Sequence, residues 1–335
     1  MILVTGGTGF LGAQLTFDLV NAGNRVRIPV RNHSKKRNLE FVFNNKEDWS
    51  SMIDFVEADL SDMQSVQELV DGCDQIYHCA AQVSFLPSQA QSMIQANEEI
   101  TANLVNALLG QENVRLCHVS SVAALGRNGS GETIDENSIW NNAGHNSNYA
   151  KSKYAAEREI WRGIAEGLNA FIINPSIILG PGHYKSIGMS FQRQVWNGLA
   201  FYTKGANSFC DVRDVSKAMI SLMSQSNING RYIIASANAT YQDLFNTIAQ
   251  ELNKKKAAIF IPPILNPFIV SIEKIRTSIS GTKPLITKET ARTASEKYYY
   301  KNDKIKSAVD FDFLPLQKTL QESCKSFLNQ MSAIV

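Results

Sequence analysis

A tyrosine and a lysine stand four residues apart in the run Tyr149-Ala150-Lys151-Ser152-Lys153, and Ser121 lies upstream. If the run is helical, Tyr149 and Lys153 share one face, since positions i and i+4 are neighbours on a helix. A nearby ammonium stabilises a phenolate and lowers the tyrosine pKa from its ordinary value of about 10. Tyr149 could then exchange a proton with a carbonyl or alcohol oxygen that Ser121 positions. We therefore expect Ser121, Tyr149 and Lys153 to be catalytic.

The tyrosine–lysine spacing is not specific by itself, because Tyr300 and Lys304 repeat it. That second pair follows no strand that ends in serine and lies in a segment rich in lysine and tyrosine. We interpret it as surface structure. Ser121, in contrast, directly follows the apolar run 115–120, which is typical of a buried strand.

A glycine-rich turn follows the first apolar run, residues 2–5, with the spacing G-x-x-G-x-x-G at Gly6, Gly9 and Gly12. Gly6 allows a tight turn, Gly9 allows the backbone to approach a pyrophosphate, and Gly12 allows the next helix to pack closely. The helix N-terminus offers free N–H groups to phosphates. The turn therefore predicts a dinucleotide site, with these candidate cofactor-binding residues: Gly6, Thr8, Gly9, Phe10, Leu11 and Gly12.

The second strand, 25–30, indicates which dinucleotide binds. NAD enzymes usually place an acidic residue at its tip, but this strand is followed by Arg31, and Lys35 comes soon after. A guanidinium suits a 2′-phosphate by its charge and its forked donors. We therefore expect NADP(H), with NAD as the alternative. Asp59 and Leu60, after the third strand, are expected beside the adenine.

Short apolar runs alternate with amphipathic helical patterns through the first half of the chain, as in successive β-α-β units. Right-handed crossovers then predict an α/β fold with a doubly wound parallel Rossmann sheet. We expect this dinucleotide-binding domain at 1–174, with 209–236 returning to it. The remainder, 175–335, is expected to form a smaller substrate-binding domain.

Composition excludes several classes of protein. The 335 residues carry a formal net charge of +2, which gives no basis for nucleic-acid binding. The five cysteines are widely spaced and lie mostly in apolar runs, as in free thiols of a reducing compartment, so we expect a cytoplasmic protein. The five histidines lack ligand spacing, and we expect no metal.

The longest apolar stretch, 257–272, is interrupted by Pro262, Pro263 and Pro267. It is too short and too broken to span a bilayer. We interpret it as core or pocket lining in preference to a membrane-surface segment. The chain opens directly on a strand with no basic start, so we expect no signal peptide.

Taken in order, these motifs resemble the extended branch of the short-chain dehydrogenases/reductases, the NAD-dependent epimerase/dehydratase family. The segments that carry the resemblance are Thr5–Gly12, His78–Ala81, Val119–Ser121, Tyr149–Lys153, Asn174–Ser176 with Gly180–Gly182, and Asp211–Val215. The run 174–182 and Val83-Ser84-Phe85 look closest to dihydroflavonol 4-reductase-like proteins.

The resemblance implies further site residues. Asn97 resembles the helix-four asparagine of that branch, which supports the active-site lysine through water or packs the site. Further cofactor contacts are implied at Cys79, Ala80, Ala81, Pro175, Ser176 and Ile177.

Three functions remain open at this point. The first is an NADPH-dependent reductase of a small, partly apolar ketone or aldehyde, with Tyr149 as the acid/base. The second is a sugar-nucleotide epimerase or dehydratase that uses the same residues without net cofactor turnover. The third is a dinucleotide sensor without catalysis, which the complete set of catalytic residues argues against. Relatives often pair through helices equivalent to 94–109 and 149–165, so a homodimer is a further expectation.

Overall fold

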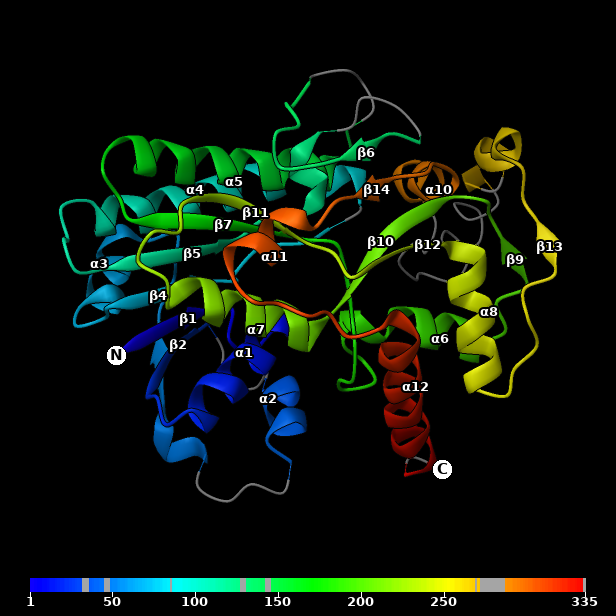
Figure 1. Cartoon of the computed structure of the whole chain (residues 1–335), viewed down its shortest axis with the longest axis horizontal. Coiled ribbons are helices and arrows are strands. Elements are labelled where there is room, and N and C mark those ends of the chain that lie inside the picture. The colour runs from blue at the N-terminus through cyan, green and yellow to red at the C-terminus, as the bar shows by residue number, and fades with distance from the viewer. Residues whose placement is uncertain are drawn as a thin grey trace.

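A seven-stranded sheet forms the centre of the computed structural model, which describes residues 1–31, 36–44, 49–84, 86–126, 131–141, 146–268, 270–271 and 287–333 (Figure 1). The strand order is β11-β7-β5-β4-β1-β2-β3, and every neighbouring pair is parallel. The order reverses between β1 and β4, which is where ligands bind in open sheets of this kind. The expected doubly wound sheet is confirmed. Its strands are β1 (Ile2–Thr5), β2 (Val26–Val30), β3 (Ile53–Glu57), β4 (Gln75–His78), β5 (Arg115–Val119), β7 (Ala170–Pro175) and β11 (Gly230–Ile234).

Helices cover both faces of this sheet (Figure 1). One face carries α3 (Met63–Val70), α4 (Ala90–Leu108) and α5 (Asn148–Ala165). The other carries α1 (Phe10–Asn21), α2 (Arg37–Val42) and α7 (Val212–Met223). Because both faces are buried, the strands read as continuous apolar runs.

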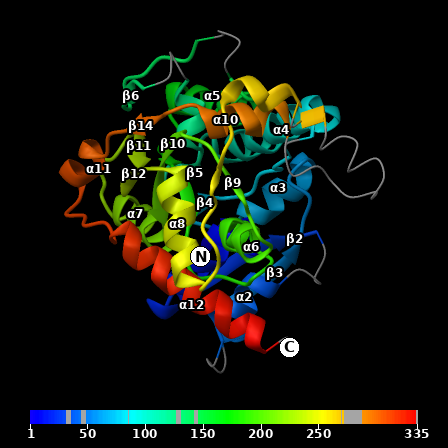
Figure 2. The same ribbon diagram turned by 90° about the vertical axis from the view of Figure 1, so that its right-hand side faces the viewer.

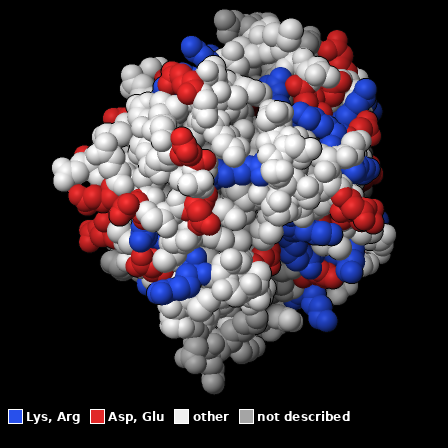
Figure 3. All heavy atoms as spheres, turned by 60° about the vertical axis from the view of Figure 1, so that its left-hand side comes forward, with Lys and Arg blue, Asp and Glu red and all other residues white. Residues whose placement is uncertain are grey.

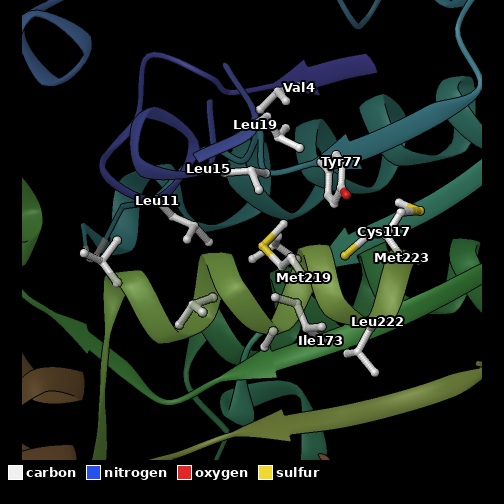
Figure 4. Packing of buried hydrophobic residues seen from close by; sticks show 14 of the residues in the cluster. Val4, Leu11, Leu15, Leu19, Tyr77, Cys117, Ile173, Met219, Leu222 and Met223 are labelled. Atoms are coloured by element: carbon white, nitrogen blue, oxygen red, sulfur yellow. The ribbon is translucent and has the colours of Figure 1, made fainter. Parts of the chain in front are cut away.

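Side chains that alternate along each strand divide between the two layers. In β1, Leu3 packs below α3 to α5, whereas Val4 packs towards α1 and α7, and both are fully buried. Figure 4 shows Leu15 of α1 facing Met219 of α7 across this second layer. This close packing fixes the start of α1, and with it the glycine turn, relative to the sheet.

A second, smaller layer packs beside the main sheet. Its three strands are β8 (Ile177–Leu179), β10 (Ala206–Asp211) and β12 (Ala237–Thr240), with β10 parallel to β8 and antiparallel to β12. Its helices α6 (Ser190–Trp196), α8 (Tyr241–Glu251) and α12 (Leu316–Ser332) lie together in Figure 2. Phe209, Tyr241 and Phe327 are buried in their shared core.

Two short strand pairs and two further helices lie around these layers. They are β9 (Phe201–Tyr202) with β13 (Ile259–Phe260), β6 (Thr133–Ile134) with β14 (Tyr299–Tyr300), α10 (Lys288–Ser295) and α11 (Asp303–Ala308). The interpretation of Tyr300 and Lys304 as surface structure was wrong for Tyr300. Its ring is buried with Ile134 and Ile233, because β14 pairs with β6 over the main sheet.

Surface charge and thiols agree with the composition. On the face shown in Figure 3, acidic and basic side chains are interspersed. All five cysteines are free, and four of them are buried. Within the described ranges, no helix is long and apolar enough to cross a membrane.

Candidate active site

The glycine turn between β1 and α1 is closed so tightly that side chains are excluded. Gly6 adopts a φ of +69°, and a Cβ on it would lie 2.8 Å from the Ala80 backbone nitrogen. A Cβ on Gly12 would lie 2.2 Å from the Gly6 carbonyl oxygen. Gly9 caps α1 without any side-chain hydrogen bond, so the first N–H groups of the helix face outward as an anion site. The turn therefore fits a dinucleotide pyrophosphate.

The other candidate residues of this turn are held by their neighbours. The carbonyl of Thr8 accepts a hydrogen bond from the Asn38 side chain at 3.0 Å. The Phe10 ring packs on the 182–188 loop, where a Cβ on Gly188 would lie 2.2 Å from it. Leu11 is a core residue, so only its backbone is available to a ligand.

The tips of β2 and β3 bring Arg31 and Asp59 close together. Arg31 is exposed, and its charge contributes to lowering the Asp59 pKa. The main cause of that lowered pKa is the Ser61 backbone N–H, which donates to Asp59 Oδ1 at 3.0 Å, followed by the Ser61 hydroxyl at 2.8 Å. Leu60, which follows Asp59 in the sequence, is half-buried. Lys35 lies outside the described residues.

The segment after β4 is fixed by a buried hydrogen-bonded chain. The Ala80 N–H donates to Thr5 Oγ1 at 3.2 Å, and that hydroxyl lies 2.7 Å from His78 Nδ1. His78 Nε2 lies 3.2 Å from Thr101 Oγ1, whose own proton goes to the Asn97 carbonyl. Thr101 must therefore accept from Nε2–H, which leaves Nδ1 to accept from Thr5.

Burial lowers the pKa of His78 to about 3, so the ring is neutral, as this arrangement requires. This series of hydrogen bonds holds Cys79, Ala80 and Ala81 against the glycine turn, where the resemblance implies cofactor contacts. Cys79 also donates its backbone N–H to the Thr5 carbonyl at 3.1 Å. Burial raises the pKa of its thiol to about 12, so the thiol stays protonated and unreactive at neutral pH.

The three candidate catalytic residues meet where β5 ends and α5 begins. A side-chain hydrogen bond joins Ser121 to Tyr149. Ser121 Oγ also accepts from the Ala123 N–H at 3.2 Å, which orients the hydroxyl at the start of its short 3-10 helix. Lys153 lies one turn further along α5, is 5% exposed, and donates from Nζ to the Val119 carbonyl at 2.9 Å.

The electrostatics of this group differ from the sequence expectation. Burial raises the pKa of Tyr149, and the hydrogen bond with Ser121 lowers it by less. The expected lowering by Lys153 is not seen, because that ammonium is directed at the Val119 carbonyl. Burial lowers the pKa of Lys153 to about 8. Tyr149 is thus protonated at neutral pH, while Lys153 titrates at about pH 8.

The Asn97 side chain joins the segment after β4 to α5 by hydrogen bonds. Its Oδ1 accepts from the Gln82 N–H at 2.7 Å, and its Nδ2 donates to the Gln82 carbonyl at 2.8 Å and to Ser152 Oγ at 2.6 Å. The amide oxygen and both amide protons are therefore engaged with Gln82 and Ser152, and none of these hydrogen bonds goes to Lys153. Of the two roles that the resemblance implied, this geometry favours packing of the site.

Glu157, which the sequence analysis did not single out, lies next to the candidate catalytic residues. It follows Lys153 by four residues, is 1% exposed, and accepts hydrogen bonds from Ser120 Oγ at 2.6 Å and Asn174 Nδ2 at 3.0 Å. Arg231 of β11 pairs with it at 3.2 Å. Glu157 thereby ties the ends of β5 and β7 to α5. The available signal was its i+4 spacing from Lys153, which puts a carboxylate on the buried face.

A second residue that the sequence could not indicate is Glu289 of α10. Its carboxylate lies 3.4 Å from the Tyr149 backbone nitrogen and 3.4 Å from Asn148 Nδ2. A carboxylate at the N-terminus of α5 complements the helix dipole. No local pattern predicts this contact, since 140 residues separate Glu289 from Tyr149.

The remaining candidates, Pro175, Ser176 and Ile177, connect β7 to β8. Ser176 is buried, and its N–H donates to the Ile234 carbonyl at 3.0 Å. This crossing carries the chain from the main sheet into the smaller layer beside the site. Among the residues described, no group of three His, Cys, Asp or Glu could hold a metal.

Residues 2–235 match the NAD dependent epimerase/dehydratase family. The chain belongs to this family. It is 26% identical to a putative dihydroflavonol 4-reductase of Synechocystis, over 97% of this chain and 94% of that protein. It is likewise 26% identical to cinnamoyl-CoA reductase 1 of Petunia hybrida, over 97% and 91%. The crystal structure of gox2253 superposes with a TM-score of 0.80 at 26% identity, over 98% of both chains.

Membership confirms the resemblance to extended short-chain dehydrogenases/reductases that the motifs indicated. It makes the chain a member of an NAD(P)-dependent enzyme family whose reactions include reduction and epimerisation. A dinucleotide and a small-molecule substrate are typical of the family. The glycine turn described above has the geometry that such a dinucleotide needs.

Proposed function

We propose that this protein is an NADP(H)-dependent reductase of a small, partly apolar ketone or aldehyde. The observation that carries the proposal is the hydrogen bond between Ser121 and Tyr149 beside the glycine turn, with the Tyr149 pKa raised. A tyrosine that stays protonated is a proton donor, which reduction requires.

The roles of the residues follow from this geometry. The bound nicotinamide would supply a hydride to the carbonyl carbon. Ser121 would donate a hydrogen bond to the carbonyl oxygen, and Tyr149 would give its hydroxyl proton to that oxygen as the C=O π bond becomes a lone pair. The Tyr149 phenolate would then regain a proton from solvent. Lys153 has two ammonium protons beyond the one given to Val119, and these could hold the nicotinamide ribose.

Arg31 supports NADP(H) as the dinucleotide. It is exposed at the tip of β2, where the adenosine ribose lies in sheets of this type. The nearby carboxylate, Asp59, stands after β3, and its Oδ1 already accepts two hydrogen bonds from Ser61. A 2′-phosphate would therefore meet a guanidinium with free donors.

Apolar side chains next to the site support a partly apolar substrate. Val83, two residues after Ala81, is 45% exposed, and Ile187 is 62% exposed beside Gly188, which packs on Phe10. The relatives named dihydroflavonol 4-reductase and cinnamoyl-CoA reductase are reductases by name. At 26% identity they support the reaction class and do not specify the substrate.

The test is NADPH oxidation against a panel of ketones and aldehydes, with Tyr149→Phe as the variant. We expect a loss of about 10²- to 10⁴-fold in turnover, the usual contribution of a positioned acid. Tyr154→Phe is the matched control: Tyr154 lies on the same helix, stacks on Trp140, and should keep full activity. Undiminished turnover in Tyr149→Phe would refute the mechanism. Conversion of a sugar nucleotide without net NADPH consumption would favour an epimerase.

A further inference from the structure

Among the described residues, several apolar side chains at one edge of the smaller layer are exposed. We call the following residues the apolar edge: Phe201 (49% exposed), Ile259 (52%), Phe260 (37%), Ile264 (84%), Leu265 (45%) and Phe268 (67%). They come from β9, β13 and the segment after it, at the outer margin of the molecule in Figure 1. The members of this set that lie in 257–272 are therefore not core residues, whereas Ala257 and Val270 of the same stretch are buried. That this stretch lines a pocket stays a prediction. Exposed apolar side chains gathered on neighbouring segments mark an interaction surface.

Lysines border the apolar edge and acidic residues are absent from its sequence. Lys254, Lys255 and Lys256 are exposed directly before it, and Lys204 Nζ lies 4.9 Å from the centre of the Phe260 ring. Neither residues 196–210 nor 252–271 contain an aspartate or a glutamate. All the charged side chains of the two stretches are therefore positive.

Backbone pairing holds the apolar edge in a fixed position. β13 lies parallel to β9, and the Ile261 N–H donates to the Tyr202 carbonyl at 2.9 Å. Further along, Asn266 Nδ2 donates to the Ala291 carbonyl at 3.3 Å and to Ser295 Oγ at 3.1 Å. Both acceptors belong to α10, the helix whose Glu289 contacts the start of α5. Because the backbone that carries these side chains is already fixed, docking them requires no ordering of the backbone.

We propose that the apolar edge docks this protein on an anionic membrane surface. The apolar side chains would enter the interface between headgroups and acyl chains, while the lysines would contact anionic headgroups. Stable peripheral binding requires two such signals together, an apolar one and a basic one. A second copy of this chain suits the surface less well, because an interface that uses the same surface on both copies would offer the lysines no acidic partner from these two stretches.

Co-sedimentation of the full chain with vesicles tests the proposal. We expect binding to phosphatidylcholine vesicles that contain phosphatidylserine, weak binding to phosphatidylcholine alone, and weaker binding as salt rises. Replacing all three of Lys254, Lys255 and Lys256 by Gln should weaken binding roughly 100-fold, since each lysine near an anionic surface contributes about fivefold. The double variant Ile264→Asn/Phe268→Ser should also abolish sedimentation.

Ile139→Asn provides the matched control, because Ile139 is 81% exposed and lies away from this edge in sequence. It should bind vesicles as the unaltered protein does. Thermal unfolding of every variant checks that the fold is kept. The proposal is overturned if the unaltered protein binds neither vesicle, or if both edge variants bind as before. It is also overturned if sedimentation velocity shows a dimer that the Ile264→Asn/Phe268→Ser variant dissolves.

Discussion

In the proposed reaction, the charge of the buried Lys153 side chain should determine how turnover depends on pH. Burial lowers its pKa to about 8, so it carries a charge below that pH and is neutral above it. The pKa of Tyr149 is raised, so this residue keeps its proton through the same range. We therefore expect turnover of the carbonyl substrate to fall as pH rises through about 8, with a single alkaline limb that reports Lys153.

Variants on the same helix assign this limb. Lys153→Met should lose most activity, and whatever remains should not show the limb. Lys151→Met is the control, because Lys151 lies on the exposed face of α5 and should leave the pH profile unaltered. A limb that stays near pH 8 in Lys153→Met, or one that appears only above pH 10, would contradict the assignment.

At the same scale, the sequence identified the chemical groups but not their protonation states or hydrogen-bond partners. Tyr149, Lys153 and Ser121 follow from spacing and from the strand before Ser121. The direction in which each pKa moves depends on burial and on which acceptor the ammonium meets, here the Val119 carbonyl. Neither is encoded in the residues next to Lys153. Asn97 shows the same limit, since its partners are 15 and 55 residues away.

At the scale of elements, α5 is joined to two strand ends by one carboxylate. Glu157 accepts hydrogen bonds from Ser120 and Asn174 and pairs with Arg231, whose side chain is only 16% exposed. Glu157→Gln should lower the free energy of unfolding by about 3 kcal/mol, since it leaves a largely buried guanidinium without its counter-charge. Urea unfolding measures this loss. Glu159→Gln, which breaks only a surface pair with Arg162, should cost less than about 1 kcal/mol.

A second measurement separates positioning from mere stability. The Glu157 charge raises the pKa of Lys153 against the effect of burial. Removing that charge should therefore move the alkaline limb of Glu157→Gln below pH 8. An unaltered limb combined with a lower stability would mean that Glu157 supports the fold alone.

Elements of the main sheet were predictable because their cause is local. The strand at 2–5 follows from its apolar run, and the structure gives the same bounds. The pairs β9 with β13 and β6 with β14 were not predicted, because their two-residue strands leave no periodic pattern. Residues 257–272 show a further limit, because an apolar run does not reveal whether its side chains lie in the protein core or on the surface.

At the scale of the whole molecule, the sheet order places four strand tips around one dinucleotide site. β1 supplies the glycine turn, β2 supplies Arg31, β3 is followed by Asp59, and β4 by Cys79 to Ala81. This arrangement follows from β-α-β handedness and could be predicted once the strands were recognised. The smaller layer could not, because its strands β8, β10 and β12 come from three separated parts of the chain and pair in both directions.

Because the dinucleotide would contact so many elements, its binding should stabilise the entire fold. A ligand at 100 times its Kd adds about 2.7 kcal/mol to the free energy of unfolding. We expect NADPH to raise the melting temperature at a lower concentration than NADH does. Arg31→Ser should weaken NADPH binding by roughly 10- to 100-fold, the value of a hydrogen-bonded charge contact, and leave NADH binding unchanged. Arg25→Ser is the control, since Arg25 is equally exposed but precedes β2 at the opposite end of the strand. Equal shifts by both dinucleotides, unaffected by Arg31→Ser, would show that the 2′-phosphate is read elsewhere or not at all.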